Sequence, residues 1–171
     1  MRVKPVETVC DAFVCDAVRY YDHRGSFQEL FSHKDLPAFR VSQINCSISK
    51  KNVLRGLHVV PFAKLVYCVK GKIFDVVADV RKGSKTYLKW YGVELSGENQ
   101  KSLFIPPFCG HGFLAMEDDS IVVYAQDAVY NAHAESSVNY ADPKLNIKWP
   151  NVILSDKDGA APFLDSCDVE S

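Results

Sequence analysis

The chain has 171 residues, 47% of them hydrophobic, and its 20 basic and 21 acidic side chains give a formal net charge of -1. A chain of this length can form one domain that buries roughly two-thirds of its unfolded surface, so we expect a single domain over residues 1–171. The charge is balanced and not clustered, which argues against a protein whose partner is a nucleic acid or a membrane surface.

No segment of the sequence has the pattern of a membrane span or of a targeting segment. A membrane helix needs about 18 uninterrupted apolar residues, and a signal peptide needs a charged start before an apolar core. The six cysteines, at positions 10, 15, 46, 68, 109 and 167, form no C-x-x-C pair. Several lie in apolar runs, where a thiol behaves as a small buried hydrophobe. We therefore expect a cytoplasmic protein with reduced, structural cysteines.

The first third of the chain predicts short strands separated by turns. Roughly alternating apolar and polar residues over 13–21 favour one or two strands. After a turn, residues 27–31 are a further candidate strand, and residues 32–37 favour a short helical turn that ends at a proline. Residues 41–49 alternate with period two, which is typical of a strand with one polar face.

From residue 53 onward, short strands follow one another with turn residues between them. This spacing, without long helices, is typical of an antiparallel sandwich or barrel, and we expect a jelly roll. Beyond Asp127 the chain becomes polar and irregular, so we expect a jelly-roll core over about 22–130 and a C-terminal packing segment of loops and short helices over about 131–171. The later strands are expected at 53–60, 64–69, 73–79, 86–95, 100–105, 112–116 and 121–128.

The five histidines do not have the spacing of a common jelly-roll metal site. Such a site uses two histidines separated by one residue together with a later carboxylate. No His-x-His pair occurs, and His58 is followed by Val59-Val60. We therefore expect no metal.

The segment from Val53 to Lys64 carries an arginine, a histidine and a lysine on an otherwise apolar strand. In a regular strand Arg55 and His58 point to opposite faces, unless Gly56 introduces a bulge. Burying such groups without partners is costly, which favours a working role for His58. We place the centre of the candidate site here.

Other candidate residues each have a simpler interpretation beside the functional one. His111 lies between glycines that permit close approach of a ligand, although it and His58 can equally be core histidines bonded to their neighbours. Tyr124 lies in an apolar strand where its hydroxyl needs a partner, or it is a filler aromatic. The run Leu154-Ser155-Asp156-Lys157-Asp158 offers two carboxylates, or it is a surface loop.

Ordered motifs over about residues 22–164 resemble the dTDP-4-dehydrorhamnose 3,5-epimerase family of nucleotide-deoxysugar epimerases. The resemblance implies an all-β, cupin-type double-sheet jelly roll with short C-terminal helices and loops. It also implies an isomerase of deoxysugar biosynthesis that works as a homodimer without a cofactor. The motifs are Arg24-Gly25, Ser49-Lys50-Lys51-Asn52-Val53-Leu54-Arg55-Gly56-Leu57-His58, Lys64-Leu65-Val66, Phe74-Asp75-Val76, Leu95-Ser96-Gly97-Glu98-Asn99, Ile105-Pro106, His111-Gly112-Phe113 and Leu154-Ser155-Asp156-Lys157-Asp158-Gly159-Ala160-Ala161-Pro162.

The resemblance further implies a substrate and a reaction. The substrate is a nucleotide-diphosphate 4-keto-6-deoxy sugar, whose C3 and C5 protons are acidified by the ketone at C4. Epimerisation removes such a proton and returns one to the opposite face through an enolate. The family's base matches His58, with Asp158 orienting the imidazole. Tyr124 matches the proton donor, and Lys64 matches the cation that stabilises the enolate oxygen.

Nine further positions match residues of the family that contact the sugar nucleotide. Arginine suits the diphosphate because its planar guanidinium binds oxygens bidentately. Tyr130 matches the aromatic that stacks on the nucleobase, and part of residues 24–29 is expected to come from the partner subunit. The nine are Arg24, Glu29, Gln43, Asn45, Arg55, His111, Tyr130, Glu135 and Lys157.

Several alternatives stay open. Residues 59–63 are shorter and more apolar than in familiar members of the family, so a single-centre 3-epimerase or an epimerase of a GDP- or CDP-linked sugar also fits. A ketoisomerase on the same scaffold needs a different placement of base and acid, which spacing does not exclude. The non-enzyme alternative is a jelly-roll protein that binds sugar nucleotides. The intact set His58, Lys64, Tyr124 and Asp158 argues against it, because a binding module needs no opposed base and acid.

Overall fold

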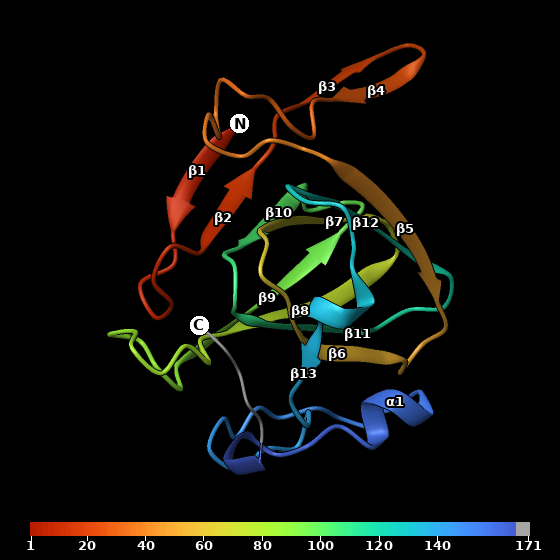
Figure 1. The fold of residues 1–171 in the computed structure, drawn as a ribbon. Helices are drawn as coiled ribbons and strands as arrows, with labels where there is room; N and C mark the ends of the chain where they lie inside the picture. Colours follow the sequence, from red (N-terminus) through yellow and green to blue (C-terminus); the bar gives the residue numbers. More distant parts are fainter. Residues whose placement is uncertain (167–171) are drawn as a thin grey trace.

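The chain folds as two antiparallel β-sheets packed face to face, with a two-stranded hairpin projecting beyond them (Figure 1). This computed structural model describes residues 1–166. The layered arrangement confirms the prediction of an all-β, double-sheet jelly roll. Helix is confined to single turns near the C-terminal end of the described chain, as the sequence predicts: η1 (Ala132–Ala134), α1 (Asp156–Gly159) and η2 (Leu164–Ser166).

The first sheet has six strands in the order β1-β2-β10-β7-β12-β5. Its first two strands precede residue 22, so the jelly roll takes in residues before the expected start of the core. Strand β5 forms the far edge, and within residues 1–166 its one partner strand is β12. The strands are β1 (Arg2–Pro5), β2 (Phe13–Asp16), β5 (Gln43–Ser49), β7 (Lys64–Lys70), β10 (Lys101–Ile105) and β12 (Ser120–Gln126).

The second sheet has five strands in the order β13-β6-β11-β8-β9. Its edge strand β13 is two residues long and pairs with β6 through Ser136 and Ser137. The sequence did not predict it, because two serines in a polar segment carry no strand pattern. The strands are β6 (Leu54–Val59), β8 (Lys72–Ala78), β9 (Trp90–Ser96), β11 (Gly110–Ala115) and β13 (Ser136–Ser137).

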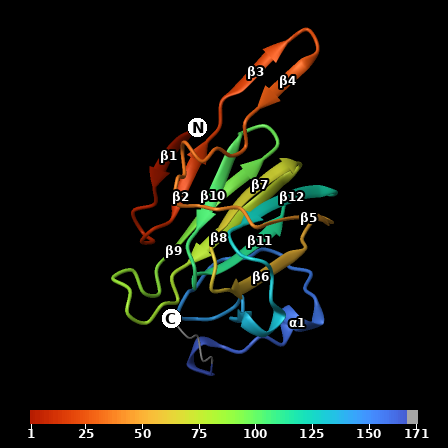
Figure 2. The same cartoon turned by 45° about the horizontal axis from the view of Figure 1, so that its top comes forward.

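The projecting hairpin joins β3 (Arg19–Asp22) to β4 (Gly25–Gln28), and it extends away from both sheets in either view (Figure 2). Its turn is tight because the Asp22 carboxylate accepts the backbone N–H of Arg24 and Gly25 adopts a φ of 131°. The second strand therefore begins at Gly25, two residues earlier than the expected strand at 27–31.

A second difference from the expected strands lies before β9, which begins at Trp90 and not at residue 86. The buried Asp79 carboxylate accepts hydrogen bonds from the hydroxyls of Ser84 and Thr86, at 2.5 and 2.6 Å. The Leu88 N–H also donates to the Asp79 carbonyl. These bonds hold residues 84–89 in turns, which the apolar pattern alone does not reveal.

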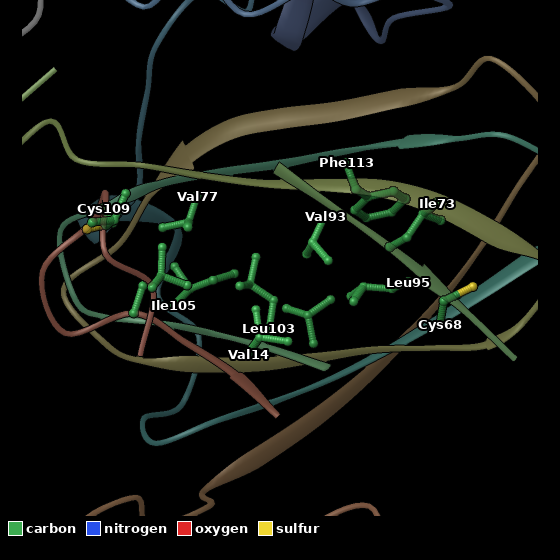
Figure 3. Packing of buried hydrophobic residues seen from close by; sticks show 14 of the residues in the cluster. Val14, Cys68, Ile73, Val77, Val93, Leu95, Leu103, Ile105, Cys109 and Phe113 are labelled. Carbon is green, nitrogen blue, oxygen red and sulfur yellow. The ribbon is translucent and has the colours of Figure 1, made fainter. Parts of the chain in front are cut away.

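The core fills the space between the sheets at the end formed by β2, β10, β8 and β9. Val14 and Leu103 from the six-stranded sheet meet Val77, Val93 and Leu95 from the five-stranded sheet (Figure 3). Apolar side chains fill the space between the sheets at this end, and the cavity lies at the opposite end, between β5 and β6.

The outer faces of both sheets are also covered, which explains why β7 and β11 are buried along most of their length. Val138, Leu145, Ile147 and Leu164 of the C-terminal segment pack on the outer face of the five-stranded sheet. Up to residue 166, this segment therefore covers one face of the β-structure with loops and short helices. On the other side, the chain after the hairpin covers β7 through residues such as Phe39, and residues 32–37 form turns there, with the Asp35 and Leu36 N–H groups donating to the Ser32 carbonyl.

The five described cysteines are free thiols, and three of them, Cys15, Cys68 and Cys109, are buried. Cys167 lies outside the described residues. Within residues 1–166 no helix combines the length and the apolar character that crossing a membrane requires.

Candidate active site

A cavity of about 580 Å³ lies between the two sheets at the β5–β6 end. Eleven of the thirteen site residues predicted from the sequence line it. The six-stranded sheet contributes amide, ammonium and phenol groups, and the five-stranded sheet contributes a guanidinium and two imidazoles. The eleven are Gln43, Asn45, Arg55, His58, Lys64, His111, Tyr124, Tyr130, Glu135, Lys157 and Asp158.

A bulge in β6 brings Arg55 and His58 to the same cavity. Arg55 pairs with Phe113 and His58 pairs with His111, so β6 carries one more residue than β11 between these two pairs. Gly56 lies in the bulge with a φ of 127°, and a Cβ on it would come within 2.5 Å of the Gly112 Cα. Only glycine fits this close approach of two strands.

His58 forms a dyad with Asp158. Its Nε2 lies 2.8 Å from the Asp158 Oδ1, across 100 residues of sequence. Burial raises the pKa of the Asp158 carboxyl, but hydrogen bonds from His58 and Ser155 outweigh it and place the pKa below its ordinary value. Asp158 is therefore ionised at neutral pH and can only accept, so the His58 Nε2 must donate.

Two links to β6 position Asp158. The Ile153 N–H donates to the Asn52 carbonyl and the Leu54 N–H donates to the Ile153 carbonyl, which ties residue 153 beside the start of β6. The chain then turns into α1, where the Ser155 hydroxyl caps the Asp158 N–H at 3.2 Å. This cap fixes the helical turn that directs Asp158 to the imidazole.

A second imidazole and carboxylate pair lies next to the first. The His111 Nε2 is 2.8 Å from the Asp75 Oδ1, and Asp75 has no exposed surface. Burial lowers the pKa of His111, and the Asp75 charge opposes that shift. The other oxygen of Asp75 has no hydrogen-bond partner among the described residues. Asp75 was not among the site residues predicted from the sequence, although a carboxylate within an apolar strand is a usable signal.

Lys64 is a buried ammonium at the inner wall of the cavity, with 7% of its surface exposed. Among the described residues no carboxylate lies within ion-pair distance of its Nζ. Burial lowers the pKa of Lys64 to about 8, and the more distant charges of Glu135 and Asp75 oppose the shift. An unpaired ammonium in such a site is poised to meet a negative charge on a ligand.

Tyr124 lies on β12, in the sheet opposite His58. Burial raises its pKa above the ordinary value, and the Arg55 guanidinium opposes the shift. Tyr124 therefore keeps its proton at neutral pH. Arg55 itself is held by the Ser49 hydroxyl, which accepts from its Nε at 3.0 Å, and by the Ile48 carbonyl.

Polar side chains from three segments complete the cavity. Gln43 and Asn45 on β5 bond to one another, and Asn45 bonds to Gln126 on β12. Gln126 was not among the predicted site residues, although an amide in the apolar strand of Tyr124 was a usable signal. At the rim, Lys157 pairs with Glu135 beside Tyr130, and this bond raises the pKa of Lys157.

Two predicted residues, Arg24 and Glu29, do not line this cavity. Arg24 lies in the turn of the projecting hairpin, exposed and bonded to Asp22, and Glu29 follows the end of β4. No group of three or more His, Cys, Asp and Glu side chains within residues 1–166 lies close enough to hold a metal ion.

Comparisons with known proteins agree over nearly the whole chain. Residues 7–166 match the family model described as dTDP-4-dehydrorhamnose 3,5-epimerase. A relative of that name from Shigella flexneri is 42% identical over 168 residues, which cover 91% of this chain and 93% of the relative. The solved dTDP-6-deoxy-D-glucose-3,5-epimerase from Legionella pneumophila Philadelphia 1, in complex with dTDP-4-keto-L-rhamnose, superposes with a TM-score of 0.92 at 36% identity, covering 98% of this chain and 94% of that one. A 3′-monoepimerase from Streptomyces bikiniensis, in complex with dTDP-quinovose, has a TM-score of 0.86 at 36% identity over 90% of this chain and 84% of its own.

The fold, the site and these matches define the protein as a nucleotide-sugar epimerase, an isomerase acting on carbohydrates, built on a cupin-like jelly roll. The chain belongs to the dTDP-4-dehydrorhamnose 3,5-epimerase family. Both statements confirm the resemblance found in the sequence.

Proposed function

We propose that the protein inverts C3 and C5 of a dTDP-linked 4-keto-6-deoxy sugar. One observation carries the proposal. His58, bonded to Asp158 of α1, faces the cavity from one sheet, while Tyr124 and Lys64 face it from the other. Packed sheets are about 10 Å apart, which leaves room for one sugar ring between a base on one face and an acid on the other.

His58 acts as the base through its Nδ1. Because Nε2 donates to the ionised Asp158, the neutral imidazole carries its free lone pair on Nδ1. This nitrogen takes the proton from the carbon next to the ketone. The C–H electron pair moves into the ring as an enolate, and Asp158 stabilises the imidazolium that forms.

Lys64 stabilises the enolate. The negative charge develops on the sugar oxygen O4, and a buried ammonium without a carboxylate partner interacts strongly with it in a site that excludes water. Tyr124 then gives its phenolic proton to the same carbon from the opposite face, and exchange with solvent restores Tyr124 and His58. Repeating the steps at the second carbon completes the reaction without a cofactor.

The remaining cavity residues bind the nucleotide. Arg55 and Lys157 supply cations for the diphosphate, Gln43 and Asn45 supply amide groups, and Tyr130 at the rim stacks on the base. Asp75 holds the neutral His111 in place through a hydrogen bond from the His111 Nε2. The dTDP assignment is supported by the solved relatives that bind dTDP-linked sugars.

The working unit is a homodimer in which the hairpin of one subunit reaches the cavity of the other. The hairpin projects from the fold with exposed aromatic residues, of which Tyr21 is 71% and Phe27 69% exposed. The neighbouring edge strand β5 is unpaired on one side and exposes Ile44 and Ile48. Such an apolar edge is stabilised by a second copy of the chain. Arg24 is then delivered to the partner's diphosphate site.

The second candidate function is inversion at C3 alone, because the 3′-monoepimerase matches this chain at an identity similar to that of the 3,5-epimerases. The test is proton NMR in deuterated water with a panel of dTDP- and GDP-linked 4-keto-6-deoxy sugars. Loss of both the C3 and C5 signals on the dTDP sugar supports the proposal, whereas loss of the C3 signal alone supports the second candidate.

The same spectra test the base. Exchange should disappear in His58→Ala and persist in His33→Ala, a matched variant of an exposed histidine outside the cavity. Unchanged exchange in His58→Ala would contradict its role. Tight binding without exchange on any sugar of the panel would favour the non-catalytic alternative.

A further inference from the structure

We propose that Gln126 is a positioning residue that fixes the orientation of the substrate-facing amides of Asn45 and Gln43. The three side chains, together called the amide relay, line the cavity from β12 and β5. Gln126 is 2% exposed. The proposed reaction assigns Gln126 no chemical step. Its side chain nevertheless connects the part of the cavity wall that carries Lys64 with the part proposed to bind the nucleotide.

Four hydrogen bonds run through the relay in one direction. The Gln126 Nε2 donates to the Ala128 carbonyl at 2.9 Å, and the Gln126 Oε1 accepts from the Asn45 Nδ2 at 3.1 Å. The Asn45 Oδ1 accepts from the Gln43 Nε2 at 2.7 Å. Finally the Gln43 Oε1 accepts the backbone N–H of Tyr130 at 2.9 Å.

The two ends of the relay determine its direction. A carbonyl oxygen can only accept and a backbone N–H can only donate, so turning any one amide over creates a repulsive contact in the chain. The polarity is therefore fixed by the main chain at Ala128 and at Tyr130. One N–H of Asn45 and one of Gln43 stay outside the relay and are available to an oxygen-rich ligand.

The backbone around the relay is fixed as well. At the end of β12 the Asp127 N–H donates to the Ala63 carbonyl, and the Ala63 N–H donates to the Asp127 carboxylate at 2.9 Å. The Ser42 N–H donates to the Gln126 carbonyl at 2.8 Å. Ala63, which precedes Lys64, and Ser42, which precedes Gln43, are therefore both hydrogen-bonded to the end of the strand that carries Gln126. A ligand meets amides that are already oriented, which reduces the ordering cost of binding.

The first test is the hydrogen exchange of the Tyr130 amide in the protein without ligand. We expect Gln126→Met to raise its exchange rate on the order of tenfold, because Asn45 loses its bond to Gln126 and then no longer holds Gln43 in one orientation. Gln126→Glu keeps an acceptor for Asn45 but sets its second oxygen against the Ala128 carbonyl, so it should raise the exchange rate less than Gln126→Met does. Val122→Ala, a buried residue on the same strand outside the cavity, is the matched control for general destabilisation and should leave the Tyr130 rate unchanged.

The second test is dTDP binding by calorimetry, which rests on the proposed function. Gln126→Met should weaken binding roughly fivefold, the effect of one lost hydrogen bond, while adding little in an Asn45→Ala background. Three results would each overturn the relay. They are unchanged protection of the Tyr130 amide in Gln126→Met, an equal loss of that protection in Val122→Ala, and additive losses of dTDP affinity in the Gln126→Met, Asn45→Ala double variant. A wild-type protein that does not bind dTDP would count against the proposed nucleotide only, and the exchange rates would then decide the relay.

Discussion

The carboxylate of Asp158 sets which nitrogen of His58 is basic, so its charge should matter more than its size. In Asp158→Asn an amide replaces the carboxylate and no longer stabilises the imidazolium. We expect kcat to fall by ~10²–10⁴-fold with a small change in KM, as for other positioned acid and base groups. Steady-state kinetics on the dTDP sugar measures both constants.

The matched control is Asp156→Asn, an exposed carboxylate two residues earlier in α1. Its kcat should stay within about twofold of the wild type, because it affects only the charge at a helix end. A comparable loss in both variants would mean that the helical turn, and not the dyad, is what activity requires.

Lys64 should impose an alkaline limit on activity. In the proposed reaction the ammonium form stabilises the enolate, and burial lowers the pKa of Lys64 to about 8 in the folded protein. We therefore expect kcat/KM to fall as the pH rises through about 8. In Lys64→Met the rate should be lower by about 10²–10³-fold and this alkaline limb should be absent. A pH profile of Lys64→Met that keeps the limb would contradict the assignment.

The same burial predicts that Lys64 lowers stability. The pKa is about 8 in the folded chain, below the ordinary value of 10.5, so the folded state binds fewer protons between these limits. The contribution of Lys64 to the free energy of unfolding therefore rises with pH across that window. Thermal unfolding at pH 7 should therefore give a higher melting temperature for Lys64→Met than for the wild type. A lower melting temperature would show that the ammonium has a stabilising partner.

At the scale of single elements, the bulge in β6 is the feature on which the site depends most. A regular strand would turn either Arg55 or His58 away from the cavity, because successive side chains alternate between faces. In Gly56→Ala the new methyl group would meet the backbone of β11 at 2.5 Å, so we expect a loss of at least about 1–3 kcal/mol in the free energy of unfolding together with loss of activity.

The control for backbone strain alone is Gly25→Ala. Gly25 has a similar φ of 131°, but a Cβ there meets nothing within 4 Å. Urea unfolding should therefore show a smaller loss, about 1 kcal/mol or less, than for Gly56→Ala. Equal losses would mean that the close approach of β6 and β11 is not what requires glycine.

At the scale of the whole molecule, the hairpin and the cavity belong to different parts of one subunit, so the proposed dimer can be tested by complementation. Arg24→Ala and His58→Ala should each be inactive alone. A mixed dimer should regain one intact site, formed by the His58 of one chain and the Arg24 of the other. Random pairing then restores about a quarter of the wild-type activity.

The oligomeric state provides the control for this experiment. Phe27→Asp should shift the protein from dimer to monomer in sedimentation and raise KM, whereas Phe163→Asp, another exposed phenylalanine outside the hairpin, should remain dimeric. No recovery of activity on mixing, with both variants dimeric, would place Arg24 outside the partner's site.

The sequence alone was sufficient for the fold class and the family. Period-two alternation and turn residues are local signals, so the all-β class and most of the strands along the chain follow from them. The motifs around His58, Lys64 and His111 identified the family before any contact was known. The local pattern was less accurate where side chains change the path of the backbone, as at Asp79 and at the hairpin turn.

Only the tertiary structure decided how the site is assembled. The 2.8 Å contact of His58 with Asp158 joins residues 100 positions apart, and it depends on a backbone tie at Ile153 that no periodicity predicts. The pairing of His111 with Asp75 and the meeting of the three amides of the relay likewise follow from the register of neighbouring strands. Sequence patterns report which face a residue occupies within its own strand, whereas the partner across the cavity is set by how two sheets pack.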